Sequence, residues 1–276
     1  MIKNDFKRNR YIYLMALPVL VYYLLFHYQP MYGAIIAFKD FTPAKGILGS
    51  PWAGLKHFRT FFTGPYAFRL IRNTFLISFY ELIFGFPAPL LLAILMNEVM
   101  APRYKRVIQT LSYLPHFISL VVICALIKNF TASTGLVNDI IALLFGEGAR
   151  STLLQDPSNF RTVYVVSGIW QGVGWGSIIY LAAISKIDQQ LYEAAIIDGA
   201  GRFARMLHVT LPGILPTIII MLILRMGSLM SVGFEKVFLL YNSGIYETAD
   251  VISTYVYRRG IIDTDWSFSA AVGLFN

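Results

Sequence analysis

Two polar side chains inside a long apolar segment are the first candidates for binding chemistry. Gln171 and Trp175 lie four residues apart in residues 162–184, so a helix there would carry both on one face. An amide and an indole can hold a sugar, because the ring stacks on apolar sugar faces while the amide bonds hydroxyl groups. The structural alternative is a tryptophan that anchors a helix at a membrane interface. Trp175 stands near the middle of its segment, which favours the binding interpretation.

A second polar set lies in residues 215–240. Arg225, Ser228 and Glu235 fall within roughly 80° of one another on a helix that turns by about 100° per residue. A charge inside a bilayer costs roughly 2.5 to 3.5 kcal/mol, so this face is expected to point into a helix bundle or a wet cavity. The face is a candidate substrate site, with a structural ion pair as the equal alternative.

The charges of this set need partners from elsewhere in the chain. Arg225 and Glu235 would lie about 15 Å apart along a helix axis, which is too far for a direct ion pair. Glu81, in an earlier apolar segment, is a candidate partner for Arg225. Lys236 is expected to extend its ammonium outward to water.

A polar, glycine-broken interval separates these two apolar segments. Residues 193–212 read EAAIIDGAGRFARMLHVTLP, with helix formers before Gly199 and an apolar face that restarts at Phe203. The pattern predicts two short helices joined by a turn. Small alanines allow the backbone of a partner to approach closely, and carboxylates can accept hydrogen bonds from donors on that partner. These residue types therefore favour a docking contact over a catalytic site. The alternative to docking is a pair of surface helices that contact only water. The residues expected in the docking contact are Glu193, Ala194, Ala195, Asp198, Gly199, Ala200 and Phe203.

Composition indicates that these segments belong to a membrane protein. Hydrophobic residues make up 57% of the chain, charged residues 14%, and the mean hydropathy is +0.60. Each predicted span is near the roughly 20 residues that cross a bilayer. The five complete spans are residues 11–38, 73–96, 111–127, 162–184 and 215–240. A sixth begins near Trp266 and is cut off at Asn276, so we expect an all-α bundle, one domain over residues 1–276, that ends inside its sixth helix.

Basic residues near the span ends predict the orientation. Lys3, Lys7, Arg8 and Arg10 precede the first span, and a second cluster lies at residues 103–106. Cytoplasmic loops are enriched in such residues, so we expect a cytoplasmic N-terminus and a cytoplasmic 193–212 interval. The net charge of +8 is scattered over loops instead of lining one surface, which argues against nucleic acid as a partner.

Missing motifs narrow the function further. No G-x-x-x-x-G-K-[ST] loop occurs, so we expect no ATP site of that kind in this chain. The single Cys124 excludes an intramolecular disulfide. We expect no metal site, because the histidines are spread through different segments. A catalytic centre would need acid, base or metal ligands at one depth, and no such set is evident.

The interval resembles the cytoplasmic coupling loop of ABC importer permeases in its order E-A-A, D-G-A and closing L-P. Met206 and Val209 depart from that pattern, in which an aromatic residue and an isoleucine are common. The aromatic stretches 28–62 and 234–260 resemble the carbohydrate branch, which includes the maltose-type and lipoprotein-dependent sugar permeases. The likeness covers nearly the whole chain, and within that branch it is greatest to permeases for oligosaccharides cut from polysaccharides.

This resemblance implies a type I importer fold with six transmembrane helices and a coupling loop at residues 185–214. It implies a multi-pass protein of the bacterial inner or plasma membrane, surrounded by lipid, that moves a sugar or oligosaccharide by alternating access. The implied partners are a second homologous permease, two ATPase subunits that carry ATP and Mg²⁺, and an extracellular solute-binding protein. The chain itself would bind no cofactor.

Other transporters remain alternatives. Within the importer class, the solute could be an amino acid, a peptide or an ion. An ion-coupled secondary transporter would also carry intramembrane charges, but it has no need for the 193–212 interval and commonly shows an internal repeat, of which we find no trace.

Overall fold

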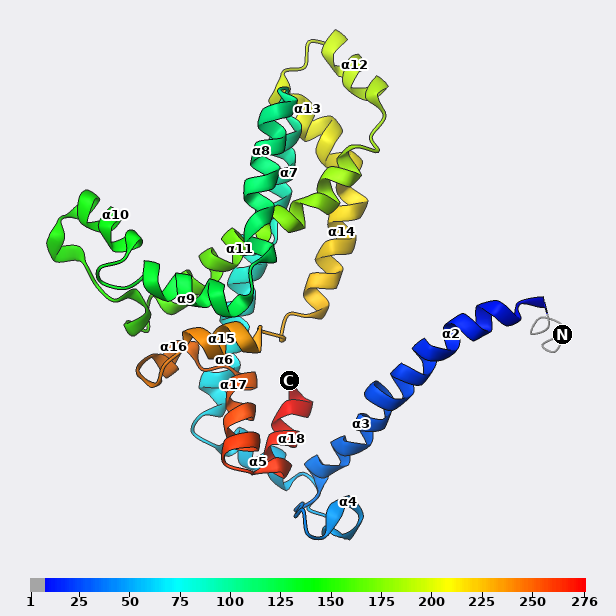
Figure 1. Cartoon of the computed structure of the whole chain (residues 1–276), viewed down its shortest axis with the longest axis vertical. Helices are drawn as coiled ribbons and strands as arrows, with labels where there is room; N and C mark the ends of the chain where they lie inside the picture. Colours follow the sequence, from blue (N-terminus) through cyan, green and yellow to red (C-terminus); the bar gives the residue numbers. More distant parts are fainter. Residues whose placement is uncertain (1–7) are drawn as a thin grey trace. The chain divides into compact units, whose positions relative to one another are not determined.

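The computed structural model describes residues 8–276, and two of the basic residues used to predict orientation, Lys3 and Lys7, lie outside them. Regular structure in this range is helical, with one isolated bridge between Lys39 and Trp52. The described chain forms two compact units (Figure 1). The first comprises residues 8–67 and Tyr255–Asn276, and the second comprises Phe68–Thr254. The predicted all-α class is confirmed.

The first unit begins with a 29-residue helical run, Arg10–Phe38. Helix α2 (Arg10–Tyr23) has no buried residue, although nearly every side chain in it is apolar. A helix that is apolar all round requires lipid or other helices as its surroundings. The run matches the first predicted span and supports a membrane location.

The remaining elements of the first unit form a small aromatic core. Helix α18 packs against α5 and against the end of the first run. The ring of Phe61 on α5 lies 6.3 Å from that of Phe268 on α18. Helix α18 begins at Trp266, where a sixth span was predicted. The first run includes α2 and α3 (Gln29–Met31). The helices that follow it in this unit are α4 (Gly46–Gly49), α5 (Lys56–Thr63), the end of α17 (Ile252–Tyr257) and α18 (Trp266–Phe275).

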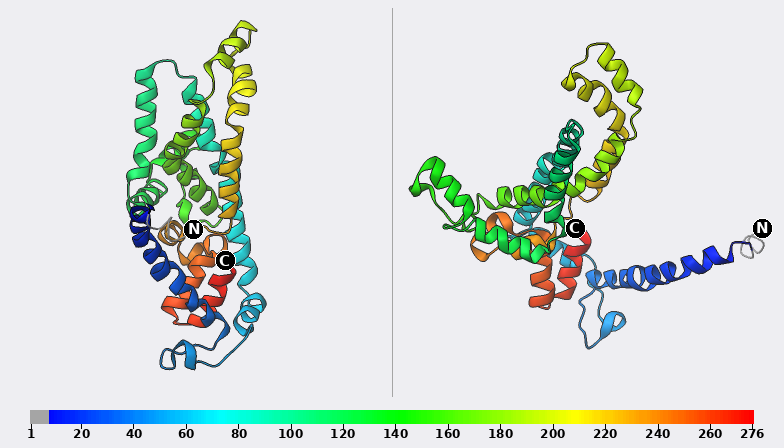
Figure 2. Two further views of the ribbon diagram at one scale, coloured as in Figure 1. Left: turned by 90° about the vertical axis from the view of Figure 1, so that its right-hand side faces the viewer. Right: turned by 45° about the horizontal axis from the view of Figure 1, so that its top comes forward.

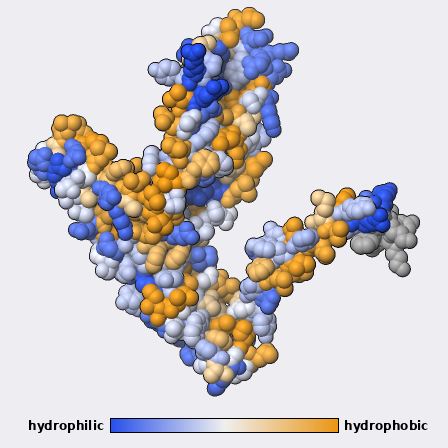
Figure 3. Space-filling view, in the orientation of Figure 1, coloured by the Kyte–Doolittle hydropathy of each residue, from blue (hydrophilic) through white to orange (hydrophobic). Residues whose placement is uncertain are grey.

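The second unit is organised around one central helix, α11 (Phe160–Ile184), which packs against α7, α8 and α14 (Figure 2). Small residues permit this packing, because a Cβ placed on Gly176 would lie 2.9 Å from Cγ of Pro89 on α7. Hydrophobic side chains stay exposed along the long helices (Figure 3), as expected in a bilayer. The helices of this unit are α6 (Ala67–Tyr80), α7 (Pro87–Asn97), α8 (Pro102–Tyr113), α9 (Leu120–Phe130), α10 (Leu136–Phe145), α11, α12 (Gln189–Ile197), α13 (Arg202–Arg205), α14 (Leu211–Gly227), α15 (Phe234–Leu240) and α16 (Tyr246–Ala249).

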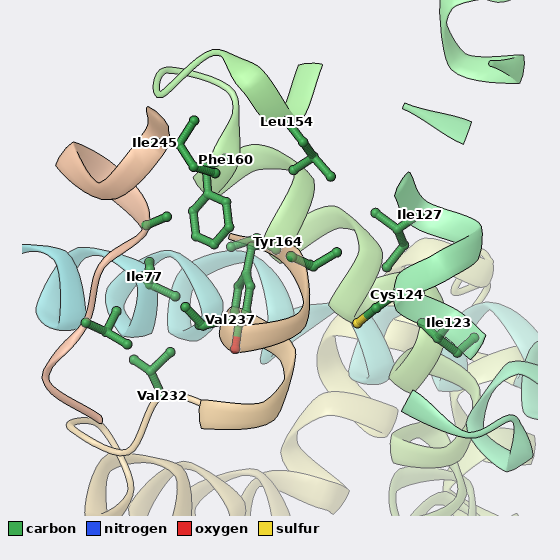
Figure 4. Packing of buried hydrophobic residues seen from close by; sticks show 14 residues of the cluster. Ile77, Ile123, Cys124, Ile127, Leu154, Phe160, Tyr164, Val232, Val237 and Ile245 are labelled. Atoms are coloured by element: carbon green, nitrogen blue, oxygen red, sulfur yellow. The ribbon is translucent and has the colours of Figure 1, made fainter. Parts of the chain in front are cut away.

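A core cluster ties the N-terminal part of α11 to neighbouring elements. Phe160 and Tyr164 of α11 face Ile77 of α6 and Val237 of α15 (Figure 4). All four side chains are buried. This packing holds α15 beside α11, which brings Lys236 close to the central helix.

The third predicted span is wrong as a straight helix. The chain bends by 103° between Pro102–Phe117 and Leu120–Phe130. Pro115 lacks a backbone N–H, Ile118 is extended, and Ser119 starts a new helix by accepting a hydrogen bond from the amide of Val122. Hydropathy stays high across the break, so composition alone could not reveal it.

The fifth predicted span, residues 215–240, has the wrong bounds. The long helix runs over Arg202–Gly227, and residues 228–233 are not helical. Gly227 weakens the helix end, and the hydroxyl of Ser228 bonds the carbonyl of Arg225. The predicted shared face of Arg225, Ser228 and Glu235 therefore does not exist. Counting the bent pair as one span, the described chain has up to five helices long and apolar enough to cross a membrane.

Candidate functional site: an exposed turn and a charged cavity

The turn at Gly199 closes helix α12 with two backbone hydrogen bonds. The amide of Gly199 donates to the carbonyl of Ile196 at 3.0 Å, and the amide of Ala200 donates to that of Ala195 at 2.8 Å. This pair of bonds is the Schellman arrangement, which places the residue after the helix cap in a left-handed conformation. Gly199 has a φ of +79°. The predicted turn is confirmed, and glycine is there because other side chains are strained at this φ.

The second predicted short helix is instead the start of the long one. Helix α13 begins after Gly201 and continues through a π-helical turn, Met206–Thr210, into α14. The interval is therefore one short helix, a turn and the end of a long helix. A displacement at the turn would act directly on α14.

Apolar side chains of this interval point away from the protein. Ile197 is 85% exposed and Phe203 is 69% exposed. Glu193, Ala194 and Asp198 are also exposed, whereas Ala195 and Ala200 are partly buried. Large apolar side chains that stay exposed beside charged ones are typical of a surface that binds another protein.

Two contacts fix helix α12 and the turn before it to the ends of the long helices. The hydroxyls of Tyr192 and Thr210 lie 2.9 Å apart. Ile187 packs so tightly on Gly213 that a Cβ there would come within 2.8 Å of its Cδ1. Ile187 belongs to a buried cluster with Ile184 of α11. Sequence reasoning missed these contacts, because each joins residues that are separated along the chain by about the length of a helix.

One cavity of the second unit, between α11, α14 and the turn after α6, has a volume of about 440 Å³. Arg225 and Ser228 line it, so the structure brings two of the predicted site residues together. Gly168 and Gly172 of α11 lie on the same wall. The cavity is mostly apolar, with its charges supplied by Arg225 and Glu81.

Arg225 and Glu81 form an ion pair on the cavity wall, as the sequence led us to consider. Nη2 of Arg225 donates to Oε2 of Glu81. Their side chains are 36% and 23% exposed, so the pair is accessible from the cavity. Glu81 lies in a π-helical turn, Glu81–Gly85, between α6 and α7. Such turns occur frequently at functional sites because they change where a side chain points.

Lys236 is buried, and the prediction that it extends to water is wrong. Its ammonium donates a hydrogen bond of 2.8 Å to the carbonyl of Tyr164 and lies 4.6 Å from the centre of that ring. Packing of α15 against α11 pulls the side chain inward, and the carbonyl and ring replace part of its hydration. Sequence reasoning identified this residue but not its burial, because the burial arises from contacts between distant segments.

Three of the predicted site residues do not line the cavity. Trp175 is 47% exposed and stacks on His116, with ring centres 4.6 Å apart and an angle of 4° between the rings. Gln171 is partly buried, and Glu235 is exposed on α15. The structure thus separates the amide and indole from Arg225 and Ser228.

Comparison with known proteins places this architecture in a family. Residues 85–247 match the family described as "binding-protein-dependent transport system inner membrane component". The chain is 48% identical to protein LplB of Bacillus subtilis (strain 168) over 98% of this chain and 84% of that one. It is 46% identical to the polygalacturonan/rhamnogalacturonan transport system permease protein YteP of the same organism, over 97% of this chain and 83% of YteP.

Solved structures show the same fold. A chain of a bacterial ABC transporter involved in the import of the acidic polysaccharide alginate superposes with a TM-score of 0.91 at 43% identity, covering 100% of this chain and 92% of that one. A chain of a bacterial alginate ABC transporter in complex with an alginate pentasaccharide-bound periplasmic protein superposes with a TM-score of 0.90 at 42% identity. That match covers 99% of this chain and 91% of the other. This protein therefore belongs to the inner membrane permease family of binding-protein-dependent ABC importers.

Proposed function

We propose that this permease imports an oligosaccharide by alternating access. The observation that carries the proposal is the connection between an exposed docking turn and the helices that line a charged cavity. The similarity to YteP and to the alginate importer supports a saccharide as the solute.

The partners in this proposal are a second homologous permease, two ATPase subunits and an external solute-binding protein. ATP and Mg²⁺ bind to the ATPase subunits, and this chain holds no cofactor. The coupling loop, residues 185–214, docks on an ATPase subunit. Phe203 is the apolar anchor, Gly199 shapes the turn, and Glu193 and Asp198 bond donors across the contact.

Movement passes from the loop to the cavity through α12 and the turn before it. Closure of the ATPase pair on ATP binding displaces the loop. Tyr192 carries that displacement to Thr210, at the base of the long helix, and Ile187 carries it to Gly213 and to the end of α11. Because α11 and α14 both line the cavity, the displacement changes which side of the membrane the cavity faces.

The basic residues support an orientation for the chain. Arg8 before the first long helix, Arg10 at its first residue, and the basic cluster at 103–106 in the first turns of α8 favour a cytoplasmic location for these helix ends and for the coupling loop. The N-terminus is then cytoplasmic, and residues 128–159 face outward.

Substrate contacts are assigned to two places. Arg225 and Ser228 contact the solute inside the cavity. The stacked pair of Trp175 and His116 offers an exposed aromatic surface for a sugar ring, with Gln171 one turn away on the same helix. Glu235 is a further candidate from α15.

Uptake by the assembled importer tests the proposal. The complex is reconstituted with its ATPase and binding protein in vesicles, and uptake of labelled oligosaccharides is measured with and without ATP. We expect uptake that requires ATP and survives collapse of proton and sodium gradients. Uptake of amino acids, peptides or ions in place of sugars would contradict the assigned solute. Uptake driven by an ion gradient without ATP would contradict the mechanism.

A further inference from the structure

Three ionisable side chains gather at the wall of the cavity. Arg225 and Glu81 line it directly. Lys236 lies immediately behind Gly168, which is also part of the wall. The three come from different elements, namely α14, the π-helical turn after α6, and α15. The fold therefore assembles a charged group that no single segment encodes.

Gly168 leaves room for two of these charges. A Cβ on residue 168 would lie 3.2 Å from Nζ of Lys236 and 3.9 Å from Oε1 of Glu81. The ammonium and the carboxylate thus share the small space beside this glycine. Lys236 is only 8% exposed, so the charge acts in a region of low dielectric constant.

The charges of this group do not balance. Glu81 forms an ion pair with Arg225, and within residues 8–276 Lys236 has an ion pair with no carboxylate. Two cations therefore share one anion. A surplus positive charge that is buried away from water is costly, which favours an anion that enters the cavity.

Arg225 has donors left for such an anion. Glu81 accepts from Nη2 alone, whereas a guanidinium has five N–H donors. The side chain is 36% exposed, and it lines the cavity. A guanidinium fork matches a carboxylate in two parallel hydrogen bonds. Glu81 orients Arg225 without using up its binding capacity.

We propose that this cavity selects acidic saccharides, with Arg225 binding a sugar carboxylate and Lys236 supplying the balancing charge from behind Gly168. The inference rests on the proposed function, since it names the class of oligosaccharide that the importer carries. Lys236 is a positioning residue in this account, because it acts through the field beside Gly168 and does not touch the sugar.

A pair of matched ligands tests the selection. The assembled importer in vesicles is given an oligogalacturonide and its carboxyl-reduced counterpart, which has the same length and linkage without the charge. The ratio of kcat/KM for the acidic and neutral ligands is measured with one binding protein throughout, so the selectivity of that protein cancels between variants. We expect Lys236→Met and Arg225→Gln each to lower this ratio by about tenfold.

Control variants separate charge selection from damage to the fold. Lys236→Arg keeps the charge and is expected to retain most of the preference. Arg103→Gln removes an exposed charge from α8 and is expected to leave the ratio unchanged. Gly168→Ala crowds the ammonium of Lys236 without removing it and is expected to lower the ratio by a smaller factor. This variant still tests the inference if Lys236→Met fails to fold.

Other outcomes overturn the inference in distinguishable ways. An unchanged ratio in Lys236→Met, with uptake intact, overturns acid selection and leaves the oligosaccharide importer standing. If the ATP-hydrolysing complex carries neither sugar, both proposals fall. A third probe, sn-glycerol 3-phosphate, distinguishes a phosphate ligand from a carboxylate ligand. If the importer carries this probe in a manner that depends on Lys236, and does not carry the oligogalacturonide, the cavity is a phosphate site and the inference is overturned.

Discussion

The turn at residues 198–201 and the cavity beside Gly168 both depend on a glycine, for opposite reasons. At Gly199 the backbone has a φ of +79°, and no atom lies within 4 Å of a would-be Cβ. At Gly168 no positive φ is involved, and the neighbouring ammonium occupies the space a side chain would need. The first glycine is required by conformation, and the second by what packs against it.

In the proposed mechanism, the turn is a surface for a partner and the cavity is a site for a small ligand. The turn is a local structure that presents apolar side chains outward. The cavity is a tertiary structure that draws charged side chains inward from three elements. Substitutions in the turn should therefore affect coupling and spare the fold, whereas substitutions at the cavity should affect both selection and stability.

The largest effect is expected from Gly199→Pro. Proline holds φ at about −65°, far from the +79° of Gly199. It also removes the N–H that donates a hydrogen bond to the carbonyl of Ile196. We expect ATP-driven uptake to fall to background while the chain remains in the membrane at normal yield. Gly201→Ala is the matched control, because Gly201 has a φ of −66° and open space at its Cβ. Equal uptake by Gly199→Pro and wild type would show that the turn does not couple the importer.

Breaking the ion pair with Glu81→Gln should destabilise the permease by about 1–3 kcal/mol, since it leaves the Arg225 charge without a partner. The estimate is below that for a fully buried pair because solvent reaches Arg225. Thermal unfolding of the assembled complex in detergent gives the comparison. The double variant Glu81→Gln with Arg225→Met should recover much of the loss while losing substrate selection. A double variant less stable than either single one would contradict the pairing.

Phe203→Ala should weaken binding of the ATPase subunit by about 1–2 kcal/mol, as expected for an aromatic anchor. The unfolding midpoint of the permease alone should stay unchanged, because the ring is exposed. Phe145→Ala on α10 is the control, since that ring is 77% exposed and lies outside the coupling loop. Equal losses in both variants would point to a general surface effect.

The smallest effect compares two glycines on α11. Gly172→Ala should stabilise the helix by about 0.5–1 kcal/mol, because nothing lies within 4 Å of the added methyl group. Gly168→Ala should lose that gain, since its methyl group would stand 3.2 Å from the Lys236 ammonium. Unfolding midpoints of the two variants, measured side by side, give the difference. A gain of the same size at both positions would show that Lys236 does not constrain Gly168.

The sequence was a good guide wherever structure is local. The glycine turn at Gly199 and the helix that starts at Trp266 follow from nearby residue types. The first and fourth predicted spans match helices Arg10–Phe38 and Phe160–Ile184 within a few residues. The second matches the end of helix Ala67–Asn97, which begins before the predicted start at residue 73. In these segments the apolar run and the helix coincide, because lipid surrounds the whole length of the helix.

The sequence was a poor guide where the ends of an apolar run do not coincide with the ends of a helix. The break at Ile118 lies inside an apolar run, and Pro115 and Ser119 were its only local signals. The helix that ends at Gly227 starts within the polar interval. Hydropathy averaged along the chain therefore predicted the middle of this helix but neither of its ends. The burial of Lys236 depends on α15 packing against α11, which no local pattern encodes.

Purification of the permease from its native membrane tests the central claim most directly. The wild-type chain and Gly199→Pro are extracted in a detergent that preserves known importer complexes, and the accompanying proteins are identified by mass spectrometry. We expect wild type to bring a second permease and an ATPase subunit, and Gly199→Pro to keep the second permease while losing the ATPase. Recovery of wild type alone, or of equal ATPase with both chains, would contradict the assignment of residues 185–214 as the coupling loop.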